Sequence, residues 1–270
     1  MARRRASTSR SVSEKRAVSS ARAGGAANPV PWQDIPFALP KVTAAARERA
    51  CRLLEALARA YPDAHCELDY RTPHELLVAT ILSAQATDVS VNKATPGLFA
   101  RFPTPADYAR ATPADIEPYI KTIGLFRSKA KSVHEAMRAL VERFGGEVPR
   151  TMEDLLTLRG VARKTANVVL GNAFGIQAGF VVDTHVDRLS KRLGLAAGTD
   201  TVQAVERRLM ALLPRESWCR ASHMLIFHGR RACKARGVEC GTHPICAEFG
   251  QRCELRIKGT PAAAGKTRSG

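Results

Sequence analysis

The 270-residue sequence contains no apolar run that approaches the about 20 residues needed to cross a bilayer. Its first 30 residues also lack the apolar core of a secretory signal. Almost nothing alternates between apolar and polar residues with a period of two, which argues against strands. Acidic residues are scarce, since 25 Asp and Glu stand against 42 Lys and Arg, for a formal net charge of +17. These absences leave a basic, globular, all-α protein as the predicted class.

The basic excess lies partly in the two ends of the chain. Residues 1–40 hold seven basic and two acidic residues, and residues 256–270 hold four basic residues and no acid. That leaves +8 for residues 41–255, so the predicted folded part is basic as well. A charged, solvated surface is one interpretation, but polyanions, most simply nucleic acid, are the expected partners. Because the ends are rich in Arg, Ser, Ala and Gly and poor in apolar bulk, residues 1–40 and 257–270 are expected to be disordered.

Helix start signals recur between these ends. Four of them place a threonine three residues before an acid: Thr72 with Glu75, Thr104 with Asp107, Thr112 with Asp115 and Thr151 with Asp154. The first three also carry proline at the first helical position, which is typical of a capped helix start. Apolar residues then follow at helical spacing, for example Leu53, Leu57 and Tyr61; Leu76, Leu77 and Ile81; and Val202, Val205, Leu209 and Leu212. Gly145, Gly146 and Gly175 are predicted helix ends.

Residues 158–169, LRGVARKTANVV, predict a helix–hairpin–helix. One helix is expected to end near Leu158, and the next begins near Arg163 after a glycine turn. Such a turn directs backbone N–H groups one way, which suits a phosphate oxygen without reading base sequence. Lys164 stands where the helix dipole disfavours an ammonium by about 0.3–1 kcal/mol. Two interpretations stay open: an ordinary surface lysine, or an amine that is needed uncharged because only the neutral form is a nucleophile.

Three separated segments together resemble the endonuclease III branch of DNA base-excision glycosylases. The first is LRGVARKTANVVLGNAFG, followed by VVDTHVDRLSKRLG; the others are ILSAQATDVSVNKAT at 81–95 and YIKTIGLFRSKA at 119–130. The resemblance runs from about residue 43 to residue 255. It implies that Lys164 and Asp183 are the catalytic residues of a DNA glycosylase with lyase activity. Asp183 would stabilise cationic character at the sugar C1′, and Lys164, partly desolvated, would attack that carbon to form a Schiff base. A role for Asp183 as a helix N-cap alone is the alternative.

The hairpin departs from the family pattern L-P-G-V-G at two positions. Arg159 replaces the proline and Ala162 replaces the second glycine, within the expected phosphate-binding residues Arg159, Gly160, Val161 and Ala162. If the second position needs a positive φ, alanine is strained there by about 1 kcal/mol. Arg159 is expected to compensate with a direct phosphate contact. These changes predict a lower affinity of the hairpin for DNA.

Gln85 and Leu125 match the family residues that fill the gap left by a flipped-out nucleotide. An amide can pair with the orphaned base, and a leucine can replace lost stacking. For Leu125 the alternative is core packing. His185 is a candidate phosphate contact, with a structural histidine as the alternative.

Seven cysteines occur, four of them in the last part of the chain: Cys233, Cys240, Cys246 and Cys253. Clustered cysteines in a chain without a secretory signal suggest metal, yet no C-x2-C pair of a zinc ribbon is present. The resemblance implies a [4Fe–4S] cluster held by these four. Their spacing is C-x6-C-x5-C-x6-C, whereas the family has C-x6-C-x2-C-x5-C, and His243 stands at the x2 position. Zinc, a set of three cysteines with His243, or no metal remain alternatives; Cys51, Cys66 and Cys219 are expected to be buried hydrophobes.

The resulting prediction is a two-domain, all-α repair enzyme. Residues 66–176 would form a helical barrel domain, and residues 41–65 with 177–256 the cluster domain, so that Lys164 and Asp183 face each other across the boundary. The expected substrate is double-stranded DNA containing oxidised pyrimidines or abasic sites, bound by a monomer. Two rivals remain, a monofunctional mismatch glycosylase and a non-catalytic DNA-binding paralogue. A cytoplasmic, nucleoid-associated protein is expected, with organellar targeting left open by the Arg/Ser-rich start.

Overall fold

The computed structural model describes residues 34–236, 243–250 and 253. Most of the arm predicted at 1–40, the whole tail predicted at 257–270, and Cys240 lie outside the described residues. The chain divides into two units, Met1–Pro31 and Trp32–Gly270, and everything described below belongs to the second. Every regular element among the described residues is a helix, which confirms the all-α expectation. In this described part, no helix has the length and apolar character needed to span a bilayer.

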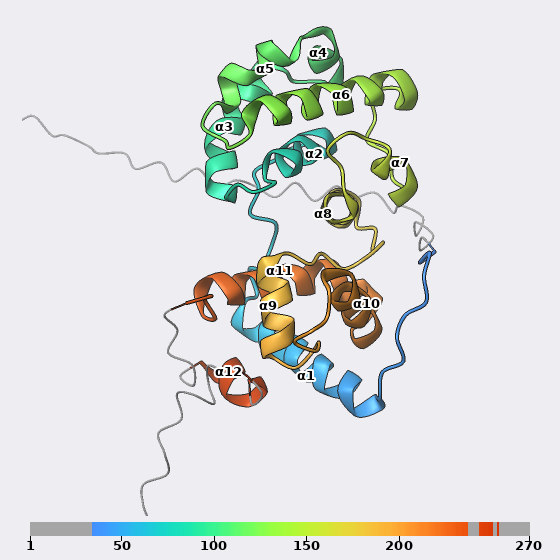
Figure 1. Ribbon diagram of the computed structural model, residues 1–270, viewed down its shortest axis with the longest axis vertical. Helices are drawn as coiled ribbons and strands as arrows, with labels where there is room; N and C mark the ends of the chain where they lie inside the picture. Colours follow the sequence, from blue (N-terminus) through green and yellow to red (C-terminus); the bar gives the residue numbers. More distant parts are fainter. Residues whose placement is uncertain (1–33, 237–242, 251–252, 254–270) are drawn as a thin grey trace, which may run out of the picture. The chain divides into compact units, whose positions relative to one another are not determined.

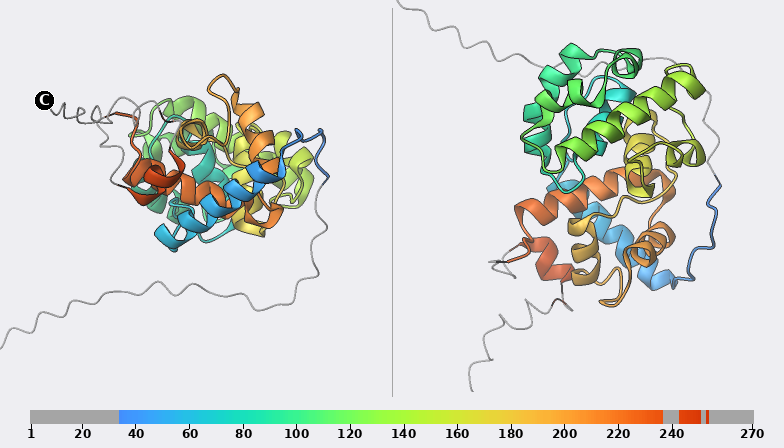
Figure 2. Two further views of the ribbon diagram at one scale, coloured as in Figure 1. Left: turned by 90° about the horizontal axis from the view of Figure 1, so that it is seen from below. Right: turned by 45° about the horizontal axis from the view of Figure 1, so that its top comes forward.

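The helices follow one another with short connections (Figures 1 and 2). Their bounds are α1 (Ala44–Ala60), α2 (Pro73–Leu82), α3 (Asp88–Arg101), α4 (Pro105–Arg110), α5 (Pro113–Ile120), α6 (Phe126–Phe144), α7 (Met152–Leu156), α8 (Arg163–Phe174), α9 (Thr184–Arg192), α10 (Val202–Leu212), the 3₁₀ turn η1 (Arg215–Ser217), α11 (Trp218–Arg231) and α12 (Pro244–Phe249).

The helix starts predicted from threonine and an acid are confirmed. Thr72, Thr104 and Thr151 each accept a hydrogen bond from the N–H group three residues ahead, over 3.1–3.3 Å. At Thr112 the carboxylate of Asp115 accepts the backbone N–H, over 2.8 Å. These bonds satisfy N–H groups that have no partner inside a helix, so the capped starts need no help from distant parts of the chain. Gly145 and Gly175 end α6 and α8 with φ of 60° and 70°, as predicted.

The buried apolar residues form two clusters. One is made of side chains from Leu68 to Val181, mostly from α2 to α8, and the other joins α1 to α9–α12. The expectation that Val202 belongs to the buried apolar face of α10 was wrong. Its side chain is 49% exposed, because Val202 is the first residue of the helix and lies beyond the buried face that Val205 and Leu209 form. The predicted boundaries of the two domains stay a prediction.

The segment between α8 and α9 is held by both clusters. Phe180 and Val182 belong to the cluster of α1 and α9–α12, whereas Val181 between them belongs to the cluster of α2–α8. This segment therefore packs against both clusters, with neighbouring side chains in different ones. Asp183 follows directly and begins α9. The position of Asp183 relative to α8 is therefore fixed by packing on two sides.

Candidate active site and DNA-contacting surface

The predicted hairpin is present between α7 and α8. Gly160 has φ of 79°, a left-handed conformation that favours glycine, and Val161 is buried. A Cβ at Gly160 would approach the Cβ of Ser132 on α6 to 3.0 Å, a tight contact, so space also favours glycine. Ala162 has φ of −95° and ψ of 170°. The strain expected from alanine at this position is therefore absent, because extended backbone there is open to any residue.

Lys164 is the second residue of α8, whose N-cap, Ala162, provides no side-chain hydrogen bond. The N–H groups of the first turn are thus left for another partner, and the helix dipole directs positive potential at the same point. The Lys164 side chain is exposed. Because this side chain is exposed, the described part of the chain does not supply the partial desolvation of Lys164 that the sequence led us to expect.

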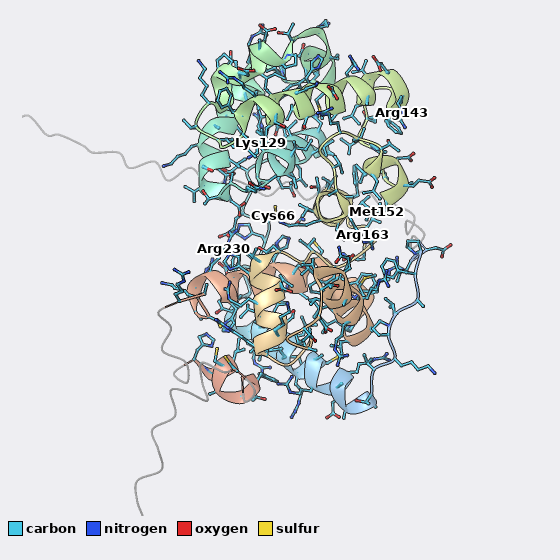
Figure 3. The ribbon with its side chains drawn as sticks, viewed as in Figure 1. Cys66, Lys129, Arg143, Met152, Arg163 and Arg230 are labelled. Carbon is cyan, nitrogen blue, oxygen red and sulfur yellow. The ribbon has the colours of Figure 1, made fainter. Side chains whose placement is uncertain are left out.

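A partly buried ion pair fixes the start of α8. Arg163 donates from Nε to both carboxylate oxygens of Glu206 on α10, over 2.9 and 3.1 Å, and Asn167 donates to the same carboxylate over 3.1 Å. Gly179 lies against this group, since a Cβ there would come within 2.5 Å of Glu206 Oε1. Figure 3 shows Arg163 at α8. The residue next to the candidate nucleophile is therefore immobilised against a helix about 40 residues away in sequence.

Glu206, Arg163 and Asn167 were missed by the sequence analysis. One signal was available: Glu206 is an acid in the same helical stripe as the buried Leu209 and Leu213. An acid in an apolar stripe indicates a buried partner of opposite charge. Nothing in the sequence indicated which basic residue that partner would be.

Asp183 is the N-cap of α9, as predicted, and is partly buried. Its Oδ1 accepts from the backbone N–H groups of His185 and Val186, over 2.9 and 2.8 Å. Both capping bonds go to one oxygen, and Oδ2 has no hydrogen-bond partner among the described residues. One carboxylate oxygen therefore caps the helix, while the other has no hydrogen-bond partner in the described part of the chain.

Gln85 and Leu125 are the two non-glycine residues with positive φ in the described part of the chain, at 55° and 60°. Gln85 is exposed and follows α2, while Leu125 directly precedes α6 and is 65% exposed. Core packing, the alternative for Leu125, is thereby ruled out. Left-handed backbone costs a leucine about 1–2 kcal/mol, and such strain concentrates at functional sites. The two residues singled out by resemblance are those that the fold holds in strained, exposed positions.

Two of the candidate phosphate contacts have intramolecular partners. Arg159 donates to Glu135 on α6 over 3.1 Å, and its side chain is about half exposed. Nδ1 of His185 lies 3.3 Å from a guanidinium nitrogen of Arg188, which also donates to the carbonyl of Gly229. The partner of His185 thus lies in its own helix, and Arg188 is the residue whose hydrogen bond joins α9 to α11.

The described candidate ligands Cys233, Cys246 and Cys253 are all buried and free of disulfides. A hydrogen bond from Cys246, then one from Arg192, lowers the pKa of Cys233 to about 6, against the opposing effect of burial. Two thiols in contact, with one already favouring the thiolate, form the donor set that iron–sulfur clusters use. Among the described residues no group of three side chains is arranged to hold a metal, but Cys240 is outside them. The donors present fit a cluster.

His243 is engaged elsewhere. Its Nδ1 accepts from the backbone N–H of Ile245 over 3.3 Å as the N-cap of α12, and its Nε2 lies 3.5 Å from the hydroxyl of Tyr61. Both ring nitrogens of His243 thus already have a contact within the described part of the chain. This argues against the ligand set of three cysteines and His243.

The other three cysteines are partly buried, which is less than expected. Burial raises the pKa of Cys66 to about 11 and that of Cys219 to about 12. Both remain thiols near neutral pH and are poor nucleophiles.

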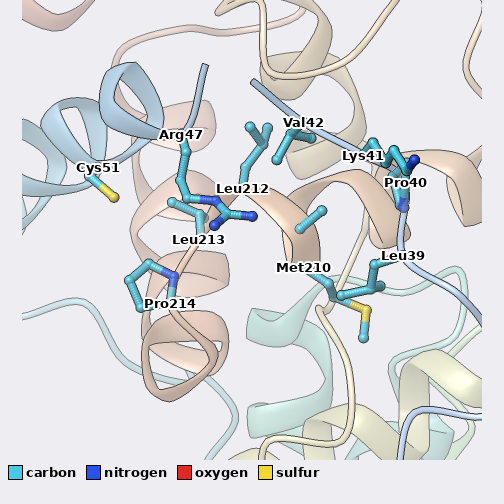
Figure 4. Close-up of a pocket in the computed structure, with 11 residues that line it drawn as sticks. Leu39, Pro40, Lys41, Val42, Arg47, Cys51, Met210, Leu212, Leu213 and Pro214 are labelled. Carbon is cyan, nitrogen blue, oxygen red and sulfur yellow. The ribbon is translucent and has the colours of Figure 1, made fainter. Parts of the chain in front are cut away.

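A pocket of about 690 Å³ lies between residues 39–42, α1 and the end of α10 (Figure 4). Its lining is mainly apolar, with Arg47 and Lys41 at hand, and includes none of the predicted site residues. It is separate from the candidate active site.

Comparison with known proteins gives the family. Residues 78–215 match the model of the HhH-GPD superfamily of base excision DNA repair proteins. The chain is 54% identical to endonuclease III of Synechocystis over 198 residues, which cover 73% of this chain and 90% of that one. It is 45% identical to endonuclease III of Bacillus subtilis, over 71% of this chain and 87% of that one. Among solved structures, a non-covalent endonuclease III–DNA complex aligns with a TM-score of 0.74 at 42% identity, covering 81% of this chain and all of that one.

A trapped covalent endonuclease III–DNA intermediate aligns equally well, with a TM-score of 0.74 and 42% identity over 80% of this chain. The helix–hairpin–helix, the helical fold and these alignments together place the chain in the HhH-GPD superfamily of base-excision repair proteins. Within that superfamily it belongs to the endonuclease III family. It is accordingly a DNA glycosylase with AP lyase activity.

Proposed function

We propose that Lys164 is the nucleophile that removes the damaged base and opens the strand. The Nζ lone pair attacks C1′ of the flipped nucleotide, the glycosidic bond breaks, and the base leaves with the bonding electrons and a proton. Loss of the ring C–O bond then gives an imine between Lys164 and the sugar. Removal of a 2′ proton expels the 3′ phosphate by β-elimination. The observation that carries this proposal is the place of Lys164, exposed in the first turn of a helix that no side chain caps.

Asp183 supports the departure of the base electrostatically. Its free Oδ2 would stabilise the cationic character that grows at C1′, while Oδ1 holds the start of α9. A rigid carboxylate needs no reorganisation at the moment of reaction. Closure of DNA over the exposed Lys164 would supply the desolvation that the chain itself does not.

The DNA contacts follow from the same elements. The hairpin of Arg159, Gly160, Val161 and Ala162 offers backbone N–H groups to a phosphate, and breaking its pair with Glu135 would free Arg159 for a second contact. Gln85 and Leu125 would enter the gap left by the flipped nucleotide. His185, if it contacts a phosphate, does so beside Arg188.

The cofactor proposed for the chain is a [4Fe–4S] cluster held by Cys233, Cys240, Cys246 and Cys253. When bound, the cluster supplies a fixed, structural crosslink of the loop that joins α11 to α12, and no bond-breaking step passes through it. The loop carries basic residues that would then face the DNA backbone. Residues 66–176 and 41–65 with 177–256 would be the two domains that close on the duplex.

The proposed substrate is duplex DNA with an oxidised pyrimidine or an abasic site, bound by a monomer in the cytoplasm, on the nucleoid. A monofunctional mismatch glycosylase would have no use for a lysine at the hairpin, and a non-catalytic paralogue would have no use for a carboxylate with one free oxygen. The structural similarity to a trapped covalent endonuclease III–DNA intermediate also favours the bifunctional mechanism.

Borohydride trapping on a duplex with a single thymine glycol tests the proposal. The wild-type protein is expected to give a covalent protein–DNA band and strand cleavage, and Lys164→Gln neither. Lys191→Gln, which removes a lysine paired with Asp187 on α9, is the control and should behave as wild type. A band that persists in Lys164→Gln would assign the nucleophile to another amine. Binding without any band in the wild type would favour the monofunctional or non-catalytic rival.

A further inference from the structure

A chain of buried hydrogen bonds leads from the end of α1 to a candidate cluster ligand. Tyr61 is the C-cap residue of α1, and its side-chain hydroxyl lies 2.9 Å from Nδ1 of His228 on α11. Nε2 of His228 lies 3.4 Å from the sulfur of Cys246 on α12. Tyr61 is 6% exposed and His228 is fully buried. Three helices that are far apart in the sequence thus meet through one polar chain in an otherwise apolar core.

Chemistry fixes the direction of every bond in this chain. A cysteine sulfur bound to iron has no proton, so it can only accept, and Nε2 of His228 must carry the hydrogen. Nδ1 of a neutral His228 then has a lone pair and accepts from the Tyr61 hydroxyl. The Tyr61 oxygen can accept from Nε2 of His243 at 3.5 Å, and Nδ1 of His243 accepts from the Ile245 N–H. Tyr61, His228 and His243 then each donate one of these bonds and accept another.

A second sulfur has a donor of a different kind. Arg192, the last residue of α9, lies 3.3 Å from the sulfur of Cys233 and also donates to the carbonyl of Lys234 over 2.8 Å. Hydrogen bonds to ligand sulfurs withdraw electron density from an iron–sulfur cluster and raise its reduction potential. Arg192 is always protonated and always donates. In contrast, whether Nε2 of His228 carries a hydrogen depends on the hydrogen bond between its Nδ1 and the Tyr61 hydroxyl.

We propose that Tyr61 and His228 form a relay that keeps an N–H donor on the sulfur of Cys246 and thereby sets the reduction potential and oxidative stability of the cluster. This inference rests on the proposed cluster. Tyr61 acts through His228, so it is a positioning residue. Without the Tyr61 hydroxyl, the imidazole hydrogen can move to Nδ1, and Nε2 then presents a lone pair to the sulfur in place of a donor.

The experiment compares Tyr61→Phe with wild type by iron content, the Fe–S stretching frequencies in resonance Raman spectra, and the midpoint potential of the DNA-bound protein in film voltammetry. Tyr61→Phe is expected to keep its iron, to shift the Fe–S stretches to higher frequency, to move the midpoint potential to a more negative value, and to lose cluster absorbance several-fold faster in air. The matched control is Tyr70→Phe, since the Tyr70 hydroxyl donates to a backbone carbonyl in α8 instead. It should leave all four readouts unchanged.

A second pair of variants covers the case in which Tyr61→Phe fails to fold. His228→Asn removes the sulfur donor, and His223→Asn changes a partly buried histidine on the same helix whose partner is Asn172. Only His228→Asn should shift the Raman bands and the potential. Full iron content with unchanged bands and potential in both Tyr61→Phe and His228→Asn would overturn the relay while leaving the proposed function intact. A wild-type protein without iron would overturn the cluster and the relay together, and borohydride trapping would still report on Lys164.

Discussion

At the residue scale, the proposed role of Asp183 gives one carboxylate two tasks, one for each oxygen. Oδ1 accepts both capping bonds of α9, and the proposal assigns Oδ2 to the substrate. Asp183→Asn keeps an oxygen for the cap and removes the charge. We expect its Tm to stay near the wild-type value while the single-turnover rate of base removal falls by about 100-fold or more, as when a preorganised electrostatic group is removed.

Asp183→Ala removes the cap as well and should cost a further ~1 kcal/mol of unfolding free energy. Denaturant melts and single-turnover kinetics of the two variants separate the roles. If Asp183→Asn cleaved at the wild-type rate, the residue would be an N-cap alone, the alternative that the sequence left open.

Leu125 offers a second test at this scale. Its exposed side chain has little to lose on truncation, so Leu125→Ala should change the free energy of unfolding by less than about 0.5 kcal/mol. On lesion-containing duplex the loss of the apolar side chain from the gap should weaken binding by about 10-fold, which corresponds to about 1.4 kcal/mol. Leu156→Ala, at another exposed leucine, is the control and should bind as wild type. Equal affinities of the two variants for the lesion-containing duplex would refute the proposed entry of Leu125 into the gap left by the flipped nucleotide.

Residue identities at the site were accessible from sequence, but their conformations were not. Gln85 and Leu125 were found by resemblance, while their positive φ depends on how α2 and α6 pack. The expected strain at Ala162 was wrong because the left-handed residue of the hairpin is Gly160. Glu206 was missed because its partners lie in another helix, and no local pattern joins them.

At the scale of elements, Gly229 controls how closely α11 approaches α9. A Cβ at Gly229 would lie 3.0 Å from Cβ and Nδ1 of His185 and 3.2 Å from the Arg188 guanidinium. Alanine normally stabilises a helix by up to about 1 kcal/mol over glycine, whereas overpacking costs about 1–3 kcal/mol. Gly229→Ala is therefore expected to be neutral to destabilising by about 2 kcal/mol, and to slow cleavage because α9 carries Asp183.

Gly97→Ala on α3 is the matched control for Gly229→Ala. Its Cβ would meet Tyr119 at 3.5 Å, an ordinary contact, so the full helix-propensity gain should appear as a higher Tm. Cleavage by Gly97→Ala should match wild type. A Gly229→Ala protein that gains stability equally and cleaves normally would show that the two helices can separate without moving Asp183.

Helix starts could be predicted from sequence because capping is local. Thr104 and Asp107 are three residues apart and need only each other. The approach of α11 to α9 could not be predicted, since Gly229 in sequence is one glycine among many and its neighbours come from 40 residues away. For the same reason the relay of Tyr61 and His228 had no sequence signal beyond two polar residues in apolar surroundings.

At the scale of the whole molecule, charge is the property that the sequence predicted most directly. The net charge of +17 is a sum over residues and needs no fold. How much of it acts on DNA depends on placement, and the terminal residues 1–40, which hold seven of the basic residues, can attract a duplex without an ordered contact. Their contribution should therefore be electrostatic and independent of the lesion.

Arg3, Arg4 and Arg5 make this testable in the full-length chain. Changing all three to Gln should make the negative slope of log affinity against log salt shallower, by at most about 3 for undamaged duplex. Each neutralised phosphate contributes about 0.9 to the size of that slope. Single-turnover cleavage at saturating enzyme should not change, since the three residues lie outside the proposed site. Titrations between low and physiological salt on undamaged and lesion-containing duplexes measure the slope. Single-turnover assays at saturating enzyme measure the cleavage rate. An unchanged slope would mean that these arginines make no contact with DNA, and a lower cleavage rate at saturation would mean that they act on the catalytic step.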